Sequence, residues 1–170
     1  MDRALDQAEE ILVEGRDRLG ELRAGAPKHF DLAAALAKLA DEQLPHIEFG
    51  MTVEGLVRPL APEAGDEIYQ IGREAILNAM RHAQASAIHC RLSYSSHEFM
   101  MRIQDNGKGI DPAILDGGRR SGHWGLVGMR ERATMLHGQL SIGAGDTGGV
   151  LITLSVPAGI AYARRLDRVH

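Results

Sequence analysis

The amino-acid sequence predicts an α/β (α+β) two-layer sandwich, in which helices cover one face of a mixed, mostly antiparallel sheet. Stretches with helical and strand periodicity are intermingled along the chain, and two apparent antiparallel strand pairs lie toward its end. The order is not a regular alternation of strand and helix, so we do not expect a doubly wound nucleotide-binding fold.

Composition limits the possible classes of protein. A chain of 170 residues suggests one domain with a short appendage, and a net charge of -4 argues against a general nucleic-acid partner. The single cysteine, Cys90, excludes an internal disulfide and fits a reducing compartment. No apolar run is long enough to span a bilayer and no signal peptide opens the chain. We therefore expect a soluble, cytoplasmic fragment without direct membrane contact.

The first elements are helical. Residues 2–23 are expected to form an amphipathic helix, because apolar residues recur at three- and four-residue spacing, and residues 24–27 end it as a linker. A second helix is expected from the N-cap Asp31 to about Ala40. Alternation over residues 47–53 then predicts a strand.

The middle of the chain contains the longest predicted helix, from Pro62 or Glu63 to Ala83, with proline suited to its first turn. Two strands follow, at residues 87–94 and 99–104, joined by a polar turn.

Residues 105–125 are rich in glycine and charge, and the stretch is too long for an idle connection, so we expect a functional loop. A helix at 126–136 and a hairpin of residues 139–142 and 149–156 complete the predicted order.

One edge of the long helix carries a polar stripe. Glu74, Asn78 and His82 are four residues apart, beside a continuous apolar sector. Asn78 could supply an uncharged oxygen to Mg2+, and Glu74 could hold a water or polarise an attacking group. The alternative is a solvated helix face, which this helix alone favours.

A glycine turn follows the strand that ends near Gln104. Asp105 could accept a hydrogen bond from an exocyclic amine such as that of adenine, while Gly107 and Gly109 allow positive φ and close approach of a ligand. Taken alone, an ordinary turn explains this pattern equally well.

A second glycine cluster, residues 121–130, opens directly into a helix, and backbone amides at a helix start suit phosphates. Positive charge lies nearby, on Lys108, Arg119, Arg120, His123 and Arg130. A surface loop before a capped helix is the alternative. The glycines at 145–149 by themselves suggest an ordinary hairpin.

Together, the four segments resemble the boxes of the GHKL ATPase superfamily. Glu74-x-x-x-Asn78 is similar to its N box, Asp105-x-Gly107-x-Gly109 to its G1 box, residues 122–128 to its G2 box and residues 145–149 to its last glycine box. The amino-acid sequences of residues 73–83 and 125–133 are similar to those of nitrate/nitrite-sensor-type histidine kinases. The resemblance covers about residues 31–157 and implies a Bergerat-type ATP-binding fold.

The resemblance also implies a division of the chain. Residues 1–25 look like the end of a dimerisation and phosphoacceptor helix with its linker, 26–157 like the ATP-binding catalytic domain, and 158–170 like a C-terminal tail. The implied partners are the phosphoacceptor domain of the same protein and a cognate response regulator. The full-length protein would be a homodimeric, membrane-anchored sensor.

Roles for individual residues follow from the same resemblance. Asn78 would bind Mg2+, Glu74 would assist phosphoryl transfer and Asp105 would recognise the adenine of ATP. The remaining implied ATP-binding residues are His82, Gly107, Lys108, Gly109, Ile110, Gly122, His123, Gly125, Leu126 and Arg130.

Two departures from the family pattern qualify these roles. No segment matches the phosphoacceptor motif, so the fragment should bind ATP without a histidine of its own to phosphorylate. Val150 follows Gly149 where the family often has threonine, which leaves more of the base recognition to Asp105.

Two other interpretations of the chain remain open, another kind of GHKL protein and a protein that is not an enzyme. An anti-sigma-factor-type serine kinase, or another GHKL ATPase, would share the nucleotide fold, although the helix at 2–23 and the wording of residues 128–132 count against the serine kinase. A non-enzymatic helical adaptor would bind no nucleotide. A zinc site of His89, Cys90 and His97 is not expected, because a fourth ligand is missing and the spacing is irregular.

Overall fold

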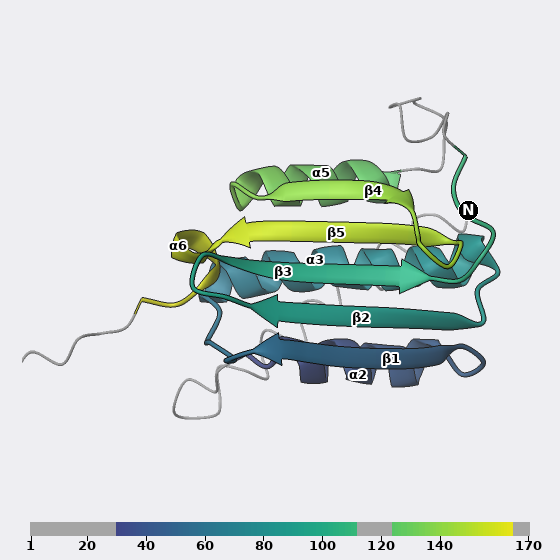
Figure 1. The fold of residues 1–170 in the computed structure, drawn as a ribbon, viewed down its shortest axis with the longest axis horizontal. Helices are drawn as coiled ribbons and strands as arrows, with labels where there is room; N and C mark the ends of the chain where they lie inside the picture. The colour runs from purple at the N-terminus through teal and green to yellow at the C-terminus, as the bar shows by residue number, and fades with distance from the viewer. Residues whose placement is uncertain (1–29, 112–123, 165–170) are drawn as a thin grey trace, which may run out of the picture.

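A computed structural model describes residues 30–111 and 124–164. These form a five-stranded sheet in the order β1-β2-β3-β5-β4, with helices on one face (Figure 1). The elements are α2 (Leu32–Gln43), β1 (Glu48–Gly55), α3 (Pro62–Asn78), η1 (Ala79–Ala83), β2 (Ala87–Tyr94), β3 (Glu98–Asp105), α5 (Trp124–Met135), β4 (Gln139–Ala144), β5 (Val150–Pro157) and α6 (Ala158–Ala161).

The pairing of the strands confirms the predicted fold class. Strand β1 runs parallel to β2, whereas β2–β3, β3–β5 and β5–β4 are antiparallel, so the sheet is mixed and mostly antiparallel. The two predicted antiparallel pairs are β2–β3 and β4–β5. The helix expected at residues 2–23 and its linker lie outside the described residues.

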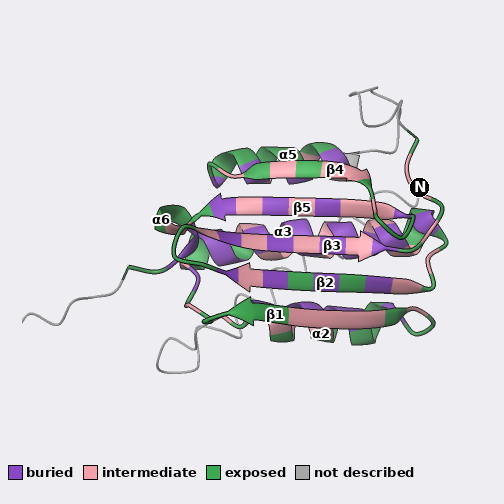
Figure 2. Cartoon of the chain, in the orientation of Figure 1, coloured by how far each residue is buried: buried purple, intermediate pink, exposed green. Residues whose placement is uncertain are grey.

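The core lies between the helices and one face of the sheet. Strand β3 shows the alternation most clearly, with every second residue from Phe99 to Asp105 buried (Figure 2). Gly72 of α3 allows close packing here, since a Cβ atom would lie 3.0 Å from Leu36 Cδ2 and 3.2 Å from Met101 Sδ. The apolar sector predicted on the long helix is therefore the surface that meets the sheet.

The helix ends follow local sequence rules. Asp31 caps α2, its Oδ1 accepting from the Ala34 N–H at 3.0 Å, and the helix continues to Gln43, one turn beyond the predicted end. The long helix reaches Ala83 as predicted, but its last turn, Ala79–Ala83, is a π-helix that stops at Gln84 with φ 52°. A π-turn carries extra backbone per turn and is common at functional sites.

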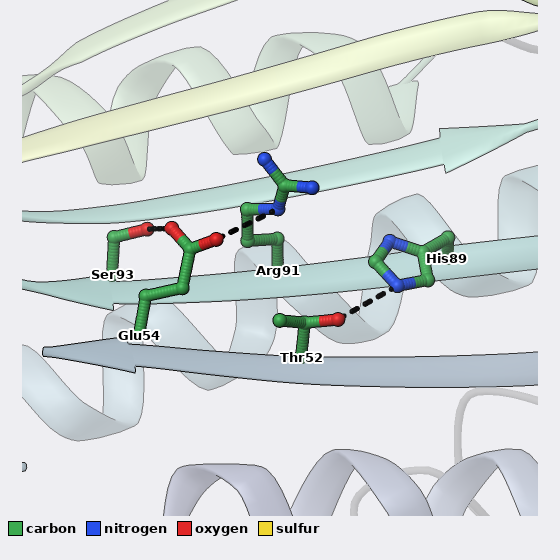
Figure 3. Close-up of polar contacts among 5 residues, drawn as sticks. All are labelled: Thr52, Glu54, His89, Arg91 and Ser93. Carbon is green, nitrogen blue, oxygen red and sulfur yellow. Dashed lines mark hydrogen bonds and ion pairs between the residues drawn. The ribbon is translucent and has the colours of Figure 1, made fainter.

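The other face of the sheet is polar, and no helix of residues 30–111 or 124–164 covers it (Figure 1). Figure 3 shows His89 bonded to Thr52 at 3.0 Å, and Glu54 contacting Arg91 at 3.5 Å and Ser93 at 3.1 Å. These pairs link β1 to β2 on the exposed side of the sheet.

The same alternation rules out the zinc set among the described residues. Cys90 is fully buried on the helix side, whereas its neighbour His89 is exposed. Burial raises the pKa of Cys90 from 9.0 to about 12, which disfavours the thiolate that zinc requires. No group of three or more potential metal ligands occurs among residues 30–111 and 124–164.

The chain does not leave the domain at the end of β5. Helix α6 follows directly, and Tyr162 forms an isolated bridge with Leu60. Tyr162 is buried and stacks on Tyr94 at 6.3 Å, while the Arg58 guanidinium lies 3.9 Å from the Tyr162 ring centroid.

The Tyr162 hydroxyl completes this contact. It donates to the Glu98 carbonyl at 3.0 Å and accepts from the Ser95 N–H at 3.2 Å. Residues 158–162, placed by the sequence analysis in a tail, thus close the end of the core opposite to the glycine turns (Figure 1). Within the described part of the chain, no helix combines the length and apolar character that crossing a bilayer requires.

We expect Tyr162→Ala to destabilise the protein by about 3–5 kcal/mol, as for other large buried aromatic truncations. Tyr162→Phe should cost roughly 1–2 kcal/mol, because the Ser95 N–H and Glu98 carbonyl lose their partner. Denaturant unfolding of the two variants measures both values. Equal stability of Tyr162→Ala and the wild type would show that the tail is not part of the folding unit.

Candidate nucleotide-binding site

A cavity of about 800 Å³ opens at the end of the sheet where β3 and the long helix both finish. Its walls come from α3 and η1, the turn after β3, the start of α5, and strands β4 and β5. The predicted site residues in the lining are Glu74, Asn78, His82, Asp105, Lys108, Gly109, Ile110, Gly125 and Leu126. Three of the four predicted segments, which are far apart in the sequence, therefore contribute residues to one cavity, whereas residues 145–149 are not part of its lining.

The other predicted residues are placed differently. Gly107 lies behind the cavity, where a Cβ atom would be 2.6 Å from Ala83 Cβ. Arg130 is exposed on α5 and is not part of the lining. Gly122 and His123 lie outside the described residues, so their predicted roles remain predictions.

The polar stripe forms one wall of the cavity. Glu74 and Asn78 are half-buried, and His82 is exposed in the π-turn one step further along. Ala75, Ala79 and Ala83 also face the cavity, and their short side chains leave room for a ligand against the helix.

Asp105 forms the deepest charged point of the cavity. It is 5% exposed, the one buried charged residue in the described part of the chain. Its Oδ1 accepts from the Gly107 N–H at 2.8 Å, which fixes the carboxylate. A buried carboxylate with remaining acceptor capacity suits an amine donor on a ligand.

Gly149 packs directly behind Asp105. Its φ is +71°, and a Cβ atom there would lie 2.5 Å from Asp105 Oδ1 and 2.6 Å from the Asp105 carbonyl carbon. Any side chain at 149 would therefore displace both the backbone and the carboxylate of Asp105. This contact gives a physical reason for glycine in the last glycine segment.

The cavity lining combines apolar side chains with cationic and polar ones. The apolar lining comes from Ile110, Leu126, Ile142, Val150 and Ile152. The lining also contains three exposed polar side chains, those of the cations Arg81 and Lys108 and of His82. A flat apolar group and an anionic group could thus bind in one cavity.

Sequence reasoning missed several lining residues. Arg81 could have been found, since it lies three residues after Asn78 and so on the adjoining helix face. Ile142 and Ile152 could not, because they reach the cavity only through the register of β4 against β5, in which they are partners.

Asn106 is a further residue that the sequence analysis passed over. Its Oδ1 accepts from the N–H groups of Ser86 and Ala87 at 2.9 and 3.0 Å, and its Nδ2 donates to Ser86 Oγ at 2.9 Å. The side chain therefore ties the turn after β3 to the start of β2. Beside it, the Lys108 N–H donates to the Ala83 carbonyl at 2.9 Å, which fastens the turn to η1.

Comparisons with known proteins support the fold and assign the family. Residues 63–160 match the family described as histidine kinase-, DNA gyrase B-, and HSP90-like ATPases, and the chain belongs to this family. The fold resembles the ATP binding domain of PrrB from Mycobacterium tuberculosis, with a TM-score of 0.59, 20% identity and coverage of 75% of this chain and 94% of that one. The fold also resembles full-length ShkA in complex with AMPPNP, with a TM-score of 0.63 and 19% identity. This match covers 93% of the present chain and 37% of ShkA.

Among curated proteins, the chain is similar to two sensor kinases. It is 36% identical to the nitrate/nitrite sensor protein NarQ of Escherichia coli over 130 residues, covering 74% of this chain and 22% of NarQ. It is 38% identical over 90 residues to the histidine-protein kinase/phosphatase DegS of Brevibacillus brevis, covering 53% of this chain and 22% of DegS. The chain spans about a fifth of the length of these relatives. The predicted family is confirmed, and the serine-kinase alternative is not favoured.

We expect Asn106→Ala to destabilise the protein by about 1–2 kcal/mol, since two backbone N–H groups lose an acceptor. Nucleotide affinity should also fall several-fold, because the turn that carries Asp105 loosens. Ser86→Ala is the matched control: it removes only the third contact and should cost less than about 1 kcal/mol. Thermal unfolding and calorimetry measure the two effects, and equal behaviour of both variants would refute this role of Asn106.

Proposed function

We propose that this ATPase-family domain binds ATP with Mg2+ and transfers the γ-phosphate to a histidine on a separate phosphoacceptor domain. The observation that carries the proposal is the single cavity in which the polar stripe of α3 faces the buried Asp105. Its volume of about 800 Å³ falls within the range of small-molecule sites. The similarity of the chain to NarQ and DegS supports a histidine as the acceptor of the phosphate.

The adenine would bind against the apolar part of the lining. Asp105 can accept a hydrogen bond from the exocyclic amine, and Ile110, Ile142 and Ile152 offer surfaces for the faces of the ring. Val150 lines the cavity without a hydroxyl, so the carboxylate supplies the polar recognition here. Guanine has a keto oxygen in place of this amine. Because that oxygen and the Asp105 carboxylate are both hydrogen-bond acceptors, guanine is disfavoured.

The triphosphate would bind near Arg81 and Lys108, which can neutralise its charge, and His82, which can donate a hydrogen bond to it. Asn78 and Glu74 present oxygen atoms on one helix edge, the donor type that Mg2+ prefers. These residues therefore fit the metal, and Asn78 would hold it without adding negative charge. Bound there, Mg2+ would offset charge on the phosphate oxygens during transfer.

In the transfer, an imidazole nitrogen of the acceptor histidine forms a bond to the γ-phosphorus as the bond to the β–γ bridging oxygen breaks, and ADP leaves. Glu74 lies one helical turn from Asn78 and can accept a hydrogen bond from the other ring N–H of that histidine. Such a contact orients the nucleophile and stabilises the positive charge that develops on the ring.

The remaining parts of the proposal concern the whole protein. Residues 1–25 would be the end of the dimerisation helix, and residues 26–157 the catalytic domain. The phosphorylated histidine would then serve a cognate response regulator. The full-length protein would be a homodimer anchored in the membrane, with this domain in the cytoplasm and no nucleic-acid partner.

Substitutions in the cavity test nucleotide recognition. We expect Asp105→Ala to weaken MgATP binding by about 10- to 100-fold, the cost of a lost hydrogen bond to a buried charged group. Asn78→Ala should weaken MgATP binding but leave metal-free ATP nearly unaffected. Calorimetry with MgATP, ATP in chelator and MgGTP measures these effects. Unchanged MgATP affinity in Asp105→Ala would exclude the proposed base contact.

Transphosphorylation tests the reaction itself. The full chain is mixed with radiolabelled ATP, Mg2+ and a separately produced phosphoacceptor domain that carries the upstream histidine. Acid-labile label on that histidine is the expected product, and Glu74→Ala should slow its appearance at least tenfold at saturating ATP, in line with loss of a general acid–base group. Nucleotide binding without label on any acceptor would reject the kinase and leave an ATP-binding module.

A further inference from the structure

The carboxylate of Glu74 lies directly against the first turn of α5. A Cβ atom at Gly125 would be 2.8 Å from Glu74 Cδ and 3.2 Å from Cγ, and it would overlap Glu74 Oε1. The nearest obstacle is the carboxylate at the end of the side chain, and Cδ and Cγ follow at increasing distance. Gly125 therefore provides the space in which the Glu74 carboxylate lies.

No other polar contact orients that carboxylate within the described part of the chain, where Glu74 has neither a hydrogen bond nor an ion pair. Its position thus depends on what packs against it. Gly125 is the second residue of α5, so the carboxylate also lies near the positive end of the helix dipole.

The geometry of the two helices explains why these residues meet. Helices α3 and α5 pack side by side, and Arg132 Nη1 of α5 contacts Glu67 Oε2 of α3 at 2.6 Å. Glu74 lies seven residues after Glu67, and Gly125 lies seven residues before Arg132. Seven residues are about two helical turns, so an antiparallel pair brings the second two residues together about 10 Å from the ion pair.

We infer that Gly125 is a positioning residue for Glu74, and that the start of α5 and the Glu74 carboxylate form one coupled unit at the cavity wall. The role of Glu74 in phosphoryl transfer rests on the proposed function, but the coupling rests on the packing alone. A shift of the first turn of α5 changes the space available to Glu74. The orientation of the Glu74 carboxylate in the cavity therefore depends on the position of the first turn of α5.

Helix propensity allows the inference to be tested by the sign of the change in melting temperature when a glycine of α5 is replaced by alanine. Glycine inside a helix is less favourable than alanine, so Gly→Ala in α5 should raise the melting temperature by roughly 2–4 °C when nothing obstructs the new methyl group. Gly128 is such a position, because a Cβ built there has no atom within 4 Å apart from its chain neighbours and the backbone of its own helix. Gly125→Ala should instead lower the melting temperature, since the methyl group displaces Glu74.

The deciding experiment is a double-mutant cycle on the full chain. Gly125→Ala and Gly128→Ala are each made in the wild type and in Glu74→Ala, and thermal unfolding is measured for every variant. We expect Gly125→Ala to lower the melting temperature by several degrees in the wild type but to raise it in Glu74→Ala, whereas Gly128→Ala raises it in both. Folding of Gly125→Ala only in the Glu74→Ala background would also support the inference.

The same shift for Gly125→Ala in both backgrounds, or failure to fold in both, would overturn it. A second readout is the transphosphorylation rate at saturating ATP. Gly125→Ala should lower this rate at least tenfold, and Gly125→Ala with Glu74→Ala should be no slower than Glu74→Ala alone. If the wild type transfers no phosphate, the proposed function fails while the melting temperatures still decide the coupling.

Discussion

The buried carboxylate of Asp105 is the constraint around which the site is built. It stands at the end of β3, in a position where an unpaired charge would be costly, and the Gly107 N–H compensates part of that cost. Gly149 must approach it without a side chain. The turn after β3 and the hairpin of β4 and β5 thus converge on this carboxylate.

The sequence predicted the features that local spacing encodes. Four-residue spacing identified the stripe from Glu74 to His82, and alternation identified the strands. The Asp105 turn needed its context, because its glycines alone are ordinary. Residues that depend on long-range register could not be found this way: Ile142 faces Ile152 only after β4 and β5 pair. Asn106 looked like a turn residue, and its three contacts appear only in the fold.

The π-turn at residues 79–83 shows why a correct helix prediction can still misplace side chains. The helix does reach Ala83, as the periodicity predicted, but the wider turn changes the direction of the residues after Asn78. Arg81 and His82 both lie in this turn and line the cavity. The four-residue stripe includes only His82, whereas the three-residue neighbour of Asn78 is Arg81.

Tyr162 has a consequence for how such domains are delimited. The family likeness ends at residue 160, while the aromatic stack of Tyr162 on Tyr94 lies two residues beyond it. A matched range marks what recurs between proteins, whereas the folding unit also includes side chains beyond it that pack into the core. For this chain, the match to the family model ends before the last described side chain that is buried in the core.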